Sequence, residues 1–183
     1  MRFTPTTIPG VVIVDPEPIA DARGWFARSY CADEFAEHGL DPTIVQCNIS
    51  VTHRAGTIRG MHYQVAPAAE TKLVRCVRGA VHDIVVDIRP ESATFLQHVA
   101  IELAAETHRA VHIPIGCAHG FQTVLDDTEV EYGMGAAYQR GSGRGLRFDD
   151  PRLALRWPLE VMVVSDQDAA WPDIAGREHE LLH

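Results

Sequence analysis

Basic residues and long apolar runs are scarce in this 183-residue sequence. Lys and Arg number 16 against 25 Asp and Glu, which gives a formal net charge of −9. A nucleic-acid-binding domain normally presents a basic field, so we expect no nucleic-acid partner, and an anionic ligand would need a local group of basic side chains. No apolar run approaches the roughly 20 residues needed to cross a bilayer. The N-terminal MRFTPTTIPG also lacks the apolar core of a signal peptide, so we expect no membrane association.

Cysteine is sparse as well. The four cysteines form no C-x-x-C pair and have no metal-ligand spacing; they are Cys31, Cys47, Cys76 and Cys117. We expect four free thiols, which suits a reducing compartment. The sequence therefore predicts a cytoplasmic protein.

Short runs of alternating or apolar residues, separated by Gly, Pro and Asp turns, make up most of the chain. They predict strands over residues 11–14, 25–30, 45–51, 57–64, 71–77, 81–88, 95–103, 110–113, 119–124 and 129–134. Many short strands at this spacing are typical of an antiparallel sandwich or barrel. The fold class is therefore predicted to be mainly β.

Helical signals are few. Residues 31–38 predict one helix, because Asp33 and Glu34 lie near its start and Gly39 follows its end. A second, weaker helical stretch is expected near the C-terminus. The length suits a single domain over residues 1–183, with the polar segment 176–183 held loosely.

Residues 59–64, RGMHYQ, contain the first candidate catalytic residue, His62. A His side chain is a natural general base because its reference pKa is about 6.5, although a lone His on a strand is more often structural. Strict alternation places Arg59 and His62 on opposite faces. Both can serve one site only if Gly60 introduces a bulge or Arg59 lies at the end of the strand.

Lys72 shares its predicted strand face with Val74 and Cys76. A lysine that points into a barrel is costly unless it meets an anion or a developing negative charge. The alternative is a lysine at the end of a strand that reaches solvent.

Tyr132 shares its predicted face with Val130 and Met134 and should also point inward. A buried Tyr hydroxyl needs a hydrogen-bond partner. Tyr132 is therefore either a core residue with a satisfied hydroxyl or a proton donor placed opposite a His base.

Residues 112–121, HIPIGCAHGF, contain a P-x-G-x-x-H pattern that resembles the second cupin motif, in which the His usually binds a metal. The first cupin motif requires H-x-H, and here Gln64 occupies the second position. A catalytic transition-metal site normally draws three or more ligands from His and carboxylate side chains, so we predict no metal. The interior would instead hold an acid–base set: His62, Lys72, Asp83, His119 and Tyr132.

Taken together, these residues resemble the dTDP-4-dehydrorhamnose 3,5-epimerase family and its relatives in antibiotic deoxysugar biosynthesis. The resemblance runs from about residue 9 to residue 173. Ten stretches match in order: residues 21–26, 46–50, 56–64, 71–74, 79–89, 94–95, 113–121, 149–151, 157–158 and 165–168. The family fold implied is a cupin jelly-roll barrel or sandwich with few short helices.

The resemblance also implies roles. His62 would accept a proton and Tyr132 would donate one, while Asp168 would orient His62. Lys72 and His119 would stabilise an enolate at the C4 oxygen, and Asp83 would hydrogen-bond within this network. The residues implied in nucleotide and diphosphate binding are Arg23, Gln46, Asn48 and Arg59, with Tyr138 stacking on the base.

The family is usually a homodimer in which an N-terminal strand crosses to the partner. The resemblance thus implies that Arg23 and the segment 25–30, including Phe26 and Arg28, complete the other subunit's site. The sequence departs from the family pattern at Arg28, where Glu is common, at Gly143 and at Gln167. All three departures fall on the nucleotide side, and the Gly-rich residues 141–145 are interpreted as a flexible loop.

The resulting hypothesis is a cofactor-free epimerase that acts at C3, C5 or both, alpha to the C4 ketone of a dTDP-4-keto-6-deoxyhexose, in the biosynthesis of rhamnose or an antibiotic sugar. Alternatives are a keto-isomerase that moves the carbonyl between C3 and C4, a non-catalytic cupin that binds the sugar nucleotide, and a metal-dependent cupin oxygenase.

Overall fold

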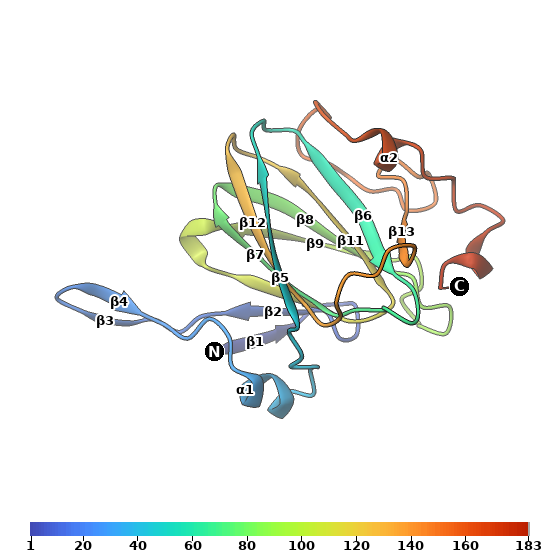
Figure 1. Cartoon of the computed structure of the whole chain (residues 1–183). Coiled ribbons are helices and arrows are strands. Elements are labelled where there is room, and N and C mark those ends of the chain that lie inside the picture. The colour runs from blue at the N-terminus through green and yellow to red at the C-terminus, as the bar shows by residue number, and fades with distance from the viewer. Residues whose placement is uncertain (183) are drawn as a thin grey trace.

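The computed structural model describes residues 1–182 and contains two antiparallel sheets packed face to face (Figure 1). The six-stranded sheet has the order β1 (Arg2–Pro5), β2 (Val12–Asp15), β10 (Ala110–Ile113), β7 (Lys72–Arg78), β12 (Thr128–Met134) and β5 (Gln46–Thr52). The five-stranded sheet has the order β13 (Gly143–Gly145), β6 (Ile58–Gln64), β11 (Cys117–Thr123), β8 (Ala80–Asp87) and β9 (His98–Ala104). This arrangement confirms the predicted jelly-roll sandwich.

The space between the sheets is filled with apolar side chains on one side and left hollow on the other. Val74 and Val111 of the six-stranded sheet pack with Val85, Leu103 and Phe121 of the five-stranded sheet, and all five are fully buried. Burial of such branched and aromatic side chains supplies most of the stabilisation of a sandwich. The hollow side lies between β5, β12 and β6, where the facing side chains are polar.

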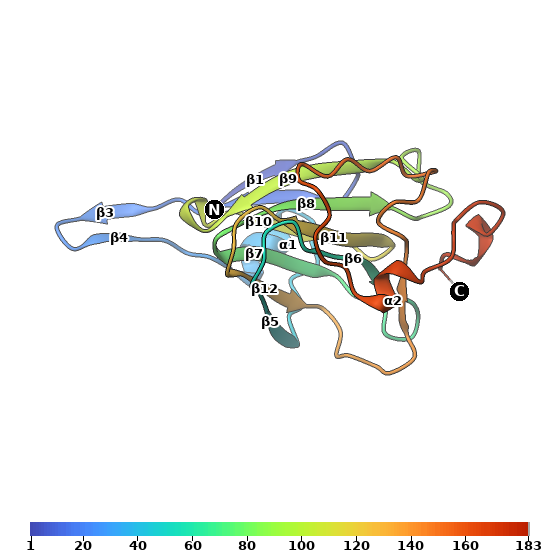
Figure 2. The same ribbon diagram turned by 90° about the horizontal axis from the view of Figure 1, so that it is seen from above.

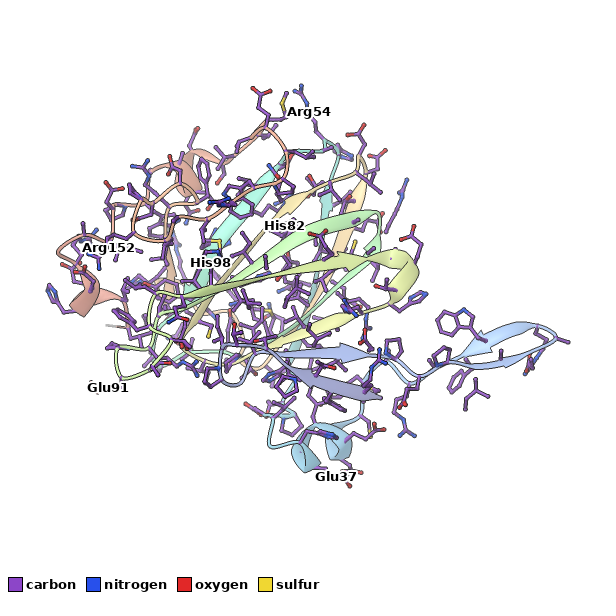
Figure 3. The ribbon with its side chains drawn as sticks, turned by 180° about the vertical axis from the view of Figure 1, so that it is seen from behind. Glu37, Arg54, His82, Glu91, His98 and Arg152 are labelled. Atoms are coloured by element: carbon purple, nitrogen blue, oxygen red, sulfur yellow. The ribbon has the colours of Figure 1, made fainter. Side chains whose placement is uncertain are left out.

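A second apolar layer covers the outer face of the five-stranded sheet. Ile84 and Val86 of β8 pack against Leu146, Leu153 and Ile174 of the C-terminal segment. Figure 3 shows this side of the molecule, with His82 on β8, His98 on β9, and Arg152 in the C-terminal segment beside them. This layer holds the C-terminal segment in place and so positions α2 (Asp166–Ala169). The short helix η2 (Glu178–Glu180) follows, and Leu181 beyond it is buried.

Helix α1 (Ala32–Glu37) packs below the edge of the six-stranded sheet through Phe35, which contacts the cluster around Val12 and Val14. Its bounds agree with the predicted helix. The short helix η1 (Ala105–Thr107) follows β9. Within residues 1–182, no helix is long and apolar enough to cross a bilayer.

A hairpin of β3 (Ile19–Asp21) and β4 (Gly24–Phe26) forms an arm that projects away from the sandwich (Figures 1 and 2). Ile19 and Phe26 are 74% and 76% exposed on this arm, and Trp25 is half-exposed. Exposed apolar surface of this kind is a common feature of protein interaction sites.

The predicted strands agree with the observed ones within a few residues, with informative exceptions. Residues 27–30 do not continue β4, because the chain leaves the arm there. β1 and β3 were not predicted; both are short and largely exposed. Residues 141–145 were interpreted as a flexible loop, which is wrong for Gly143–Gly145: these form β13 and pair with residues 62–64 of β6. Two glycines in three residues leave no side-chain alternation to detect.

A bulge at Gly60, one of the two arrangements that would let Arg59 and His62 serve one site, is present. His119 of β11 pairs with His62 and Phe121 pairs with Arg59, so two steps on β11 match three on β6. Gly60 has φ +130°, and a Cβ atom there would overlap the Gly120 backbone. The bulge turns both Arg59 and His62 toward the hollow side.

We predict that Gly60→Ala lowers the free energy of unfolding by more than about 3 kcal/mol, because strain at positive φ adds to a backbone clash. Gly141→Ala is the matched control: its φ is +92°, but an added Cβ would meet open space. We expect that control to lose about 1–2 kcal/mol. Urea unfolding measures both, and equal losses would contradict the close packing of β6 on β11.

Candidate active site

A cavity of about 690 Å³ occupies the hollow side of the sandwich. β5, β7 and β12 of one sheet and β6 and β11 of the other contribute its walls, and residues 163–171, which include α2, close it at one side. Alternation places the polar side chains of Gln46, Asn48 and Ser50 along the cavity; Ile49 also lines it, whereas Cys47 and Val51 do not.

His62 and Asp168 form a hydrogen-bonded pair in this cavity. The distance from His62 Nε2 to Asp168 Oδ1 is 2.6 Å, and the Gly60 backbone N–H donates to Asp168 Oδ2 at 3.3 Å. Ser165 caps α2 by accepting from the Asp168 N–H at 3.1 Å. Burial alone would raise the pKa of Asp168, but the hydrogen bonds from His62, Gly60 and Ser165 hold this pKa below its usual value. Asp168 is therefore an anion that fixes the imidazole.

His119 and Asp83 form a second such pair, deeper in the wall. His119 Nε2 lies 2.7 Å from Asp83 Oδ2, and both side chains are buried. Because His119 is the register partner of His62, the two imidazoles stand side by side on neighbouring strands. His119 thus lines the cavity, and Asp83 holds its imidazole in place, so the two residues belong to the same site as predicted.

Tyr132 enters the cavity from the opposite sheet. Its hydroxyl lies 3.2 Å from Ser50 Oγ, and its ring centroid is 6.3 Å from that of His119. Burial raises the pKa of Tyr132 to about 12, although the Ser50 hydrogen bond opposes this shift. The phenol therefore keeps its proton at neutral pH.

Lys72 points into the cavity wall and not into solvent. Its side chain is 8% exposed, and its Nζ lies 2.6 Å from Glu70 Oε1. Gln64 donates through Nε2 to the other oxygen of Glu70. The ammonium group is thus paired inside the protein, which is what a buried cation requires.

The residues expected to bind the nucleotide divide into two sets. Gln46, Asn48, Arg59 and Tyr138 line the cavity. Arg59 donates to Thr52 Oγ1 at 2.9 Å and to the Val51 carbonyl at 3.1 Å, which fixes its guanidinium beside β5.

Three of the residues expected to bind the substrate do not line the cavity of their own chain. Among residues 1–182, the cavity lining does not include Arg23, Phe26 or Arg28. Arg23 pairs with Asp21 on the arm, and Arg28 pairs with Glu34 of α1.

Several cavity residues were not identified from the sequence. Ser50 shares the polar face of β5, and that alternation could have revealed it. Glu70 lies in a loop, and Arg144 and Trp171 come from β13 and the C-terminal segment. No local pattern connects these three with the strands they meet.

The cavity can carry acid–base chemistry, because an imidazole held by a carboxylate faces a protonated phenol from the other sheet. Lys72 and His119 add hydrogen-bond donors between them. Among the described residues, no three His, Cys, Asp or Glu side chains are arranged to hold a metal ion. The jelly-roll fold and this site define a cupin-type acid–base enzyme.

Comparison with known proteins identifies the family. The sequence profile of the dTDP-4-dehydrorhamnose 3,5-epimerase family matches residues 5–176. A dTDP-4-dehydrorhamnose 3,5-epimerase of Sinorhizobium fredii is 37% identical over 175 residues, which cover 95% of this chain and 90% of that protein. A dTDP-4-dehydrorhamnose 3-epimerase of Streptomyces niveus is 39% identical over 92% of this chain and 83% of its own length.

A solved structure agrees with these sequence matches. The dTDP-6-deoxy-D-glucose-3,5-epimerase of Legionella pneumophila, crystallised in complex with dTDP-4-keto-L-rhamnose, superposes with a TM-score of 0.91 at 36% identity and covers 99% of this chain and 96% of that one. This chain belongs to the dTDP-4-dehydrorhamnose 3,5-epimerase family.

We predict that the buried Tyr132 makes the free energy of unfolding fall in alkaline solution. The unfolded phenol has a pKa of about 10 and the folded one about 12, so its contribution to stability is complete below pH 10 and is lost as the pH rises through 12. Between pH 10 and pH 12, the free energy of unfolding should therefore fall by up to about 2–3 kcal/mol more in wild type than in Tyr132→Phe. Denaturant titrations at stepped pH measure this difference, and parallel losses would contradict a protonated, buried phenol.

Proposed function

We propose that this chain epimerises a dTDP-4-keto-6-deoxyhexose at C3, C5 or both. The observation that carries the proposal is that His62, bound to Asp168 at 2.6 Å, and the protonated Tyr132 face one cavity from opposite sheets. Inversion of a carbon needs a base on one side and an acid on the other. Relatives that act on either one or two centres share the fold.

The first step is removal of a proton. The C4 ketone acidifies the neighbouring C–H bonds, and the His62 imidazole takes one of these protons to become an imidazolium paired with Asp168. The C–H electrons form an enolate whose negative charge develops on the C4 oxygen. Lys72 and His119 supply the donors that stabilise this oxygen, so the reaction needs no cofactor.

The second step is reprotonation. Tyr132 delivers its phenolic proton to the opposite face of the same carbon, and the enolate collapses to the ketone. The tyrosinate then recovers a proton while the imidazolium releases one, so the enzyme returns to its starting state.

The nucleotide would lie toward the mouth of the cavity. Arg59 suits a diphosphate because its guanidinium can make two parallel hydrogen bonds. Gln46 and Asn48 offer amide groups, and the exposed ring of Tyr138 offers a surface for the base. Of the three positions that depart from the family pattern, Gly143 and Gln167 line the cavity, whereas Arg28 lies outside it and pairs with Glu34.

We further propose that the chain is one functional domain that acts as a cytoplasmic homodimer. The projecting arm exposes Ile19 and Phe26, and Val45 just before β5 and Ile49 and Val51 within β5 are also exposed. Contact between two copies would bury both apolar surfaces. In that dimer Arg23 and Phe26 of the arm, and Arg28 just after it, would reach the cavity of the partner.

Incubation with dTDP-4-keto-6-deoxyglucose in heavy water tests the reaction. We expect deuterium at C3, C5 or both, with the ketone retained at C4. His62→Ala should reduce incorporation by on the order of 10³-fold, because the base is lost. NMR of the sugar reports the position of both the label and the ketone.

The matched control is His53→Ala. His53 also pairs with an aspartate, Asp127 at 3.0 Å, but lies exposed at the surface. This variant should exchange at the wild-type rate. Binding without exchange by wild type would indicate a sugar-nucleotide-binding cupin, and a ketone at C3 would indicate a keto-isomerase; either result contradicts the proposal.

Subunit complementation tests the crossing arm. Arg23→Ala and His62→Ala should each be nearly inactive as pure proteins. After mixing under conditions that exchange subunits, each mixed dimer should regain one working site, with His62 from one chain and Arg23 from the other. A mixture that stays inactive, while sedimentation shows that mixed dimers have formed, would contradict an arm shared between subunits.

A further inference from the structure

Glu70 is a buried carboxylate in the wall of the cavity, and it was not among the site residues predicted from the sequence. Its side chain is 4% exposed, and its Oε1 lies 2.6 Å from Lys72 Nζ. Glu70 comes two residues before Lys72, the first residue of β7, which lies opposite Met134 of β12. The pair therefore stands at the N-terminal end of β7, an interior strand of the six-stranded sheet, and lines the cavity.

Gln64 of β6 holds this carboxylate from the other side. Gln64 Nε2 donates to Glu70 Oε2 and to the Ala68 carbonyl at 3.2 Å. Because both neighbours are acceptors, the amide nitrogen must face them. Glu70 is thus fixed between a strand of the five-stranded sheet and the lysine of the six-stranded sheet.

A lysine without such a partner would serve poorly as a donor in this place. Its four-carbon stem is flexible, and an unpaired ammonium is costly to bury. The contact with Glu70 removes both difficulties. An ammonium carries three N–H donors, so the Glu70 contact leaves donors available to the cavity.

We propose that Glu70 is a positioning residue that holds the Lys72 ammonium and directs it toward the C4 oxygen of the substrate. This inference rests on the proposed epimerase function. Glu70 acts through Lys72 alone, so its loss should matter only while Lys72 is present.

A double-mutant cycle tests this dependence, with kcat and KM for deuterium incorporation measured for wild type, Glu70→Gln, Lys72→Met and the double variant. Glu70→Gln should lower kcat by on the order of 10- to 100-fold and change KM by less than about 3-fold, because the interaction matters most as charge develops. Lys72→Met should be at least as slow. The double variant should match Lys72→Met within about 2-fold, because the two residues act as one unit.

Melting temperatures separate this role from a purely structural one. Each single variant leaves one buried charge unpaired and should melt below wild type, whereas the double variant buries no unpaired charge and should recover. Stability would then return in the double variant while activity does not.

Glu102→Gln is the matched control, since Glu102 pairs with His82 but is 66% exposed on β9; it should retain wild-type kcat. Glu70→Asp, which keeps the charge, should fall between wild type and Glu70→Gln, and it replaces Glu70→Gln if that variant does not fold.

The outcomes are distinct. Wild-type kcat in Glu70→Gln, or a double variant slowed by the product of the two single effects, would overturn the positioning role while leaving the epimerase function intact. Absence of exchange in wild type would overturn the proposed function and this inference together.

Discussion

The close approach of β6 and β11 at Gly60 is the constraint on which the site depends. Only glycine fits there, because the backbone of Gly120 occupies the space of a side chain. The bulge that results brings Arg59 and His62 to the same side of β6. The N–H group of Gly60 also donates to Asp168, so one backbone position sets the strand register, the direction of the imidazole and the placement of its carboxylate.

Three cationic or potentially cationic groups surround the cavity, and each is backed by a buried carboxylate. His62 is paired with Asp168, His119 with Asp83, and Lys72 with Glu70. Pairing offsets the cost of removing these groups from water and fixes their directions before a ligand arrives. Tyr132 differs, because its partner Ser50 is neutral and burial keeps the phenol protonated. Tyr132, which must give up its proton, thus has a neutral partner, whereas the three groups that carry or stabilise charge each have a carboxylate partner.

The sequence predicted much of this arrangement because strand alternation is a local property. The inward direction of Lys72 and Tyr132 followed from their apolar neighbours. The conflict between alternation and a shared site pointed either to a bulge at Gly60 or to Arg59 at the end of its strand. β13 escaped prediction because glycine leaves no pattern. The link between Glu70 and Gln64 escaped because it joins a loop to a strand, and the cavity walls from Arg144 and Trp171 depend on how the C-terminal segment folds back. Such long-range contacts are set by packing of the whole domain and not by neighbouring residues. The family resemblance supplied Asp168, which no local pattern connects to His62.

The central claim is that the base and the acid act on opposite faces of one carbon, and the stereochemical course in Tyr132→Phe tests it most directly. With His62 intact and the phenol removed, the sugar should exchange its C–H hydrogen for deuterium while the configuration at that carbon is retained, because the proton can return only from the face on which His62 lies. Chiral analysis of the labelled sugar by NMR distinguishes retention from inversion. Inversion by Tyr132→Phe at a rate close to that of wild type would contradict the account.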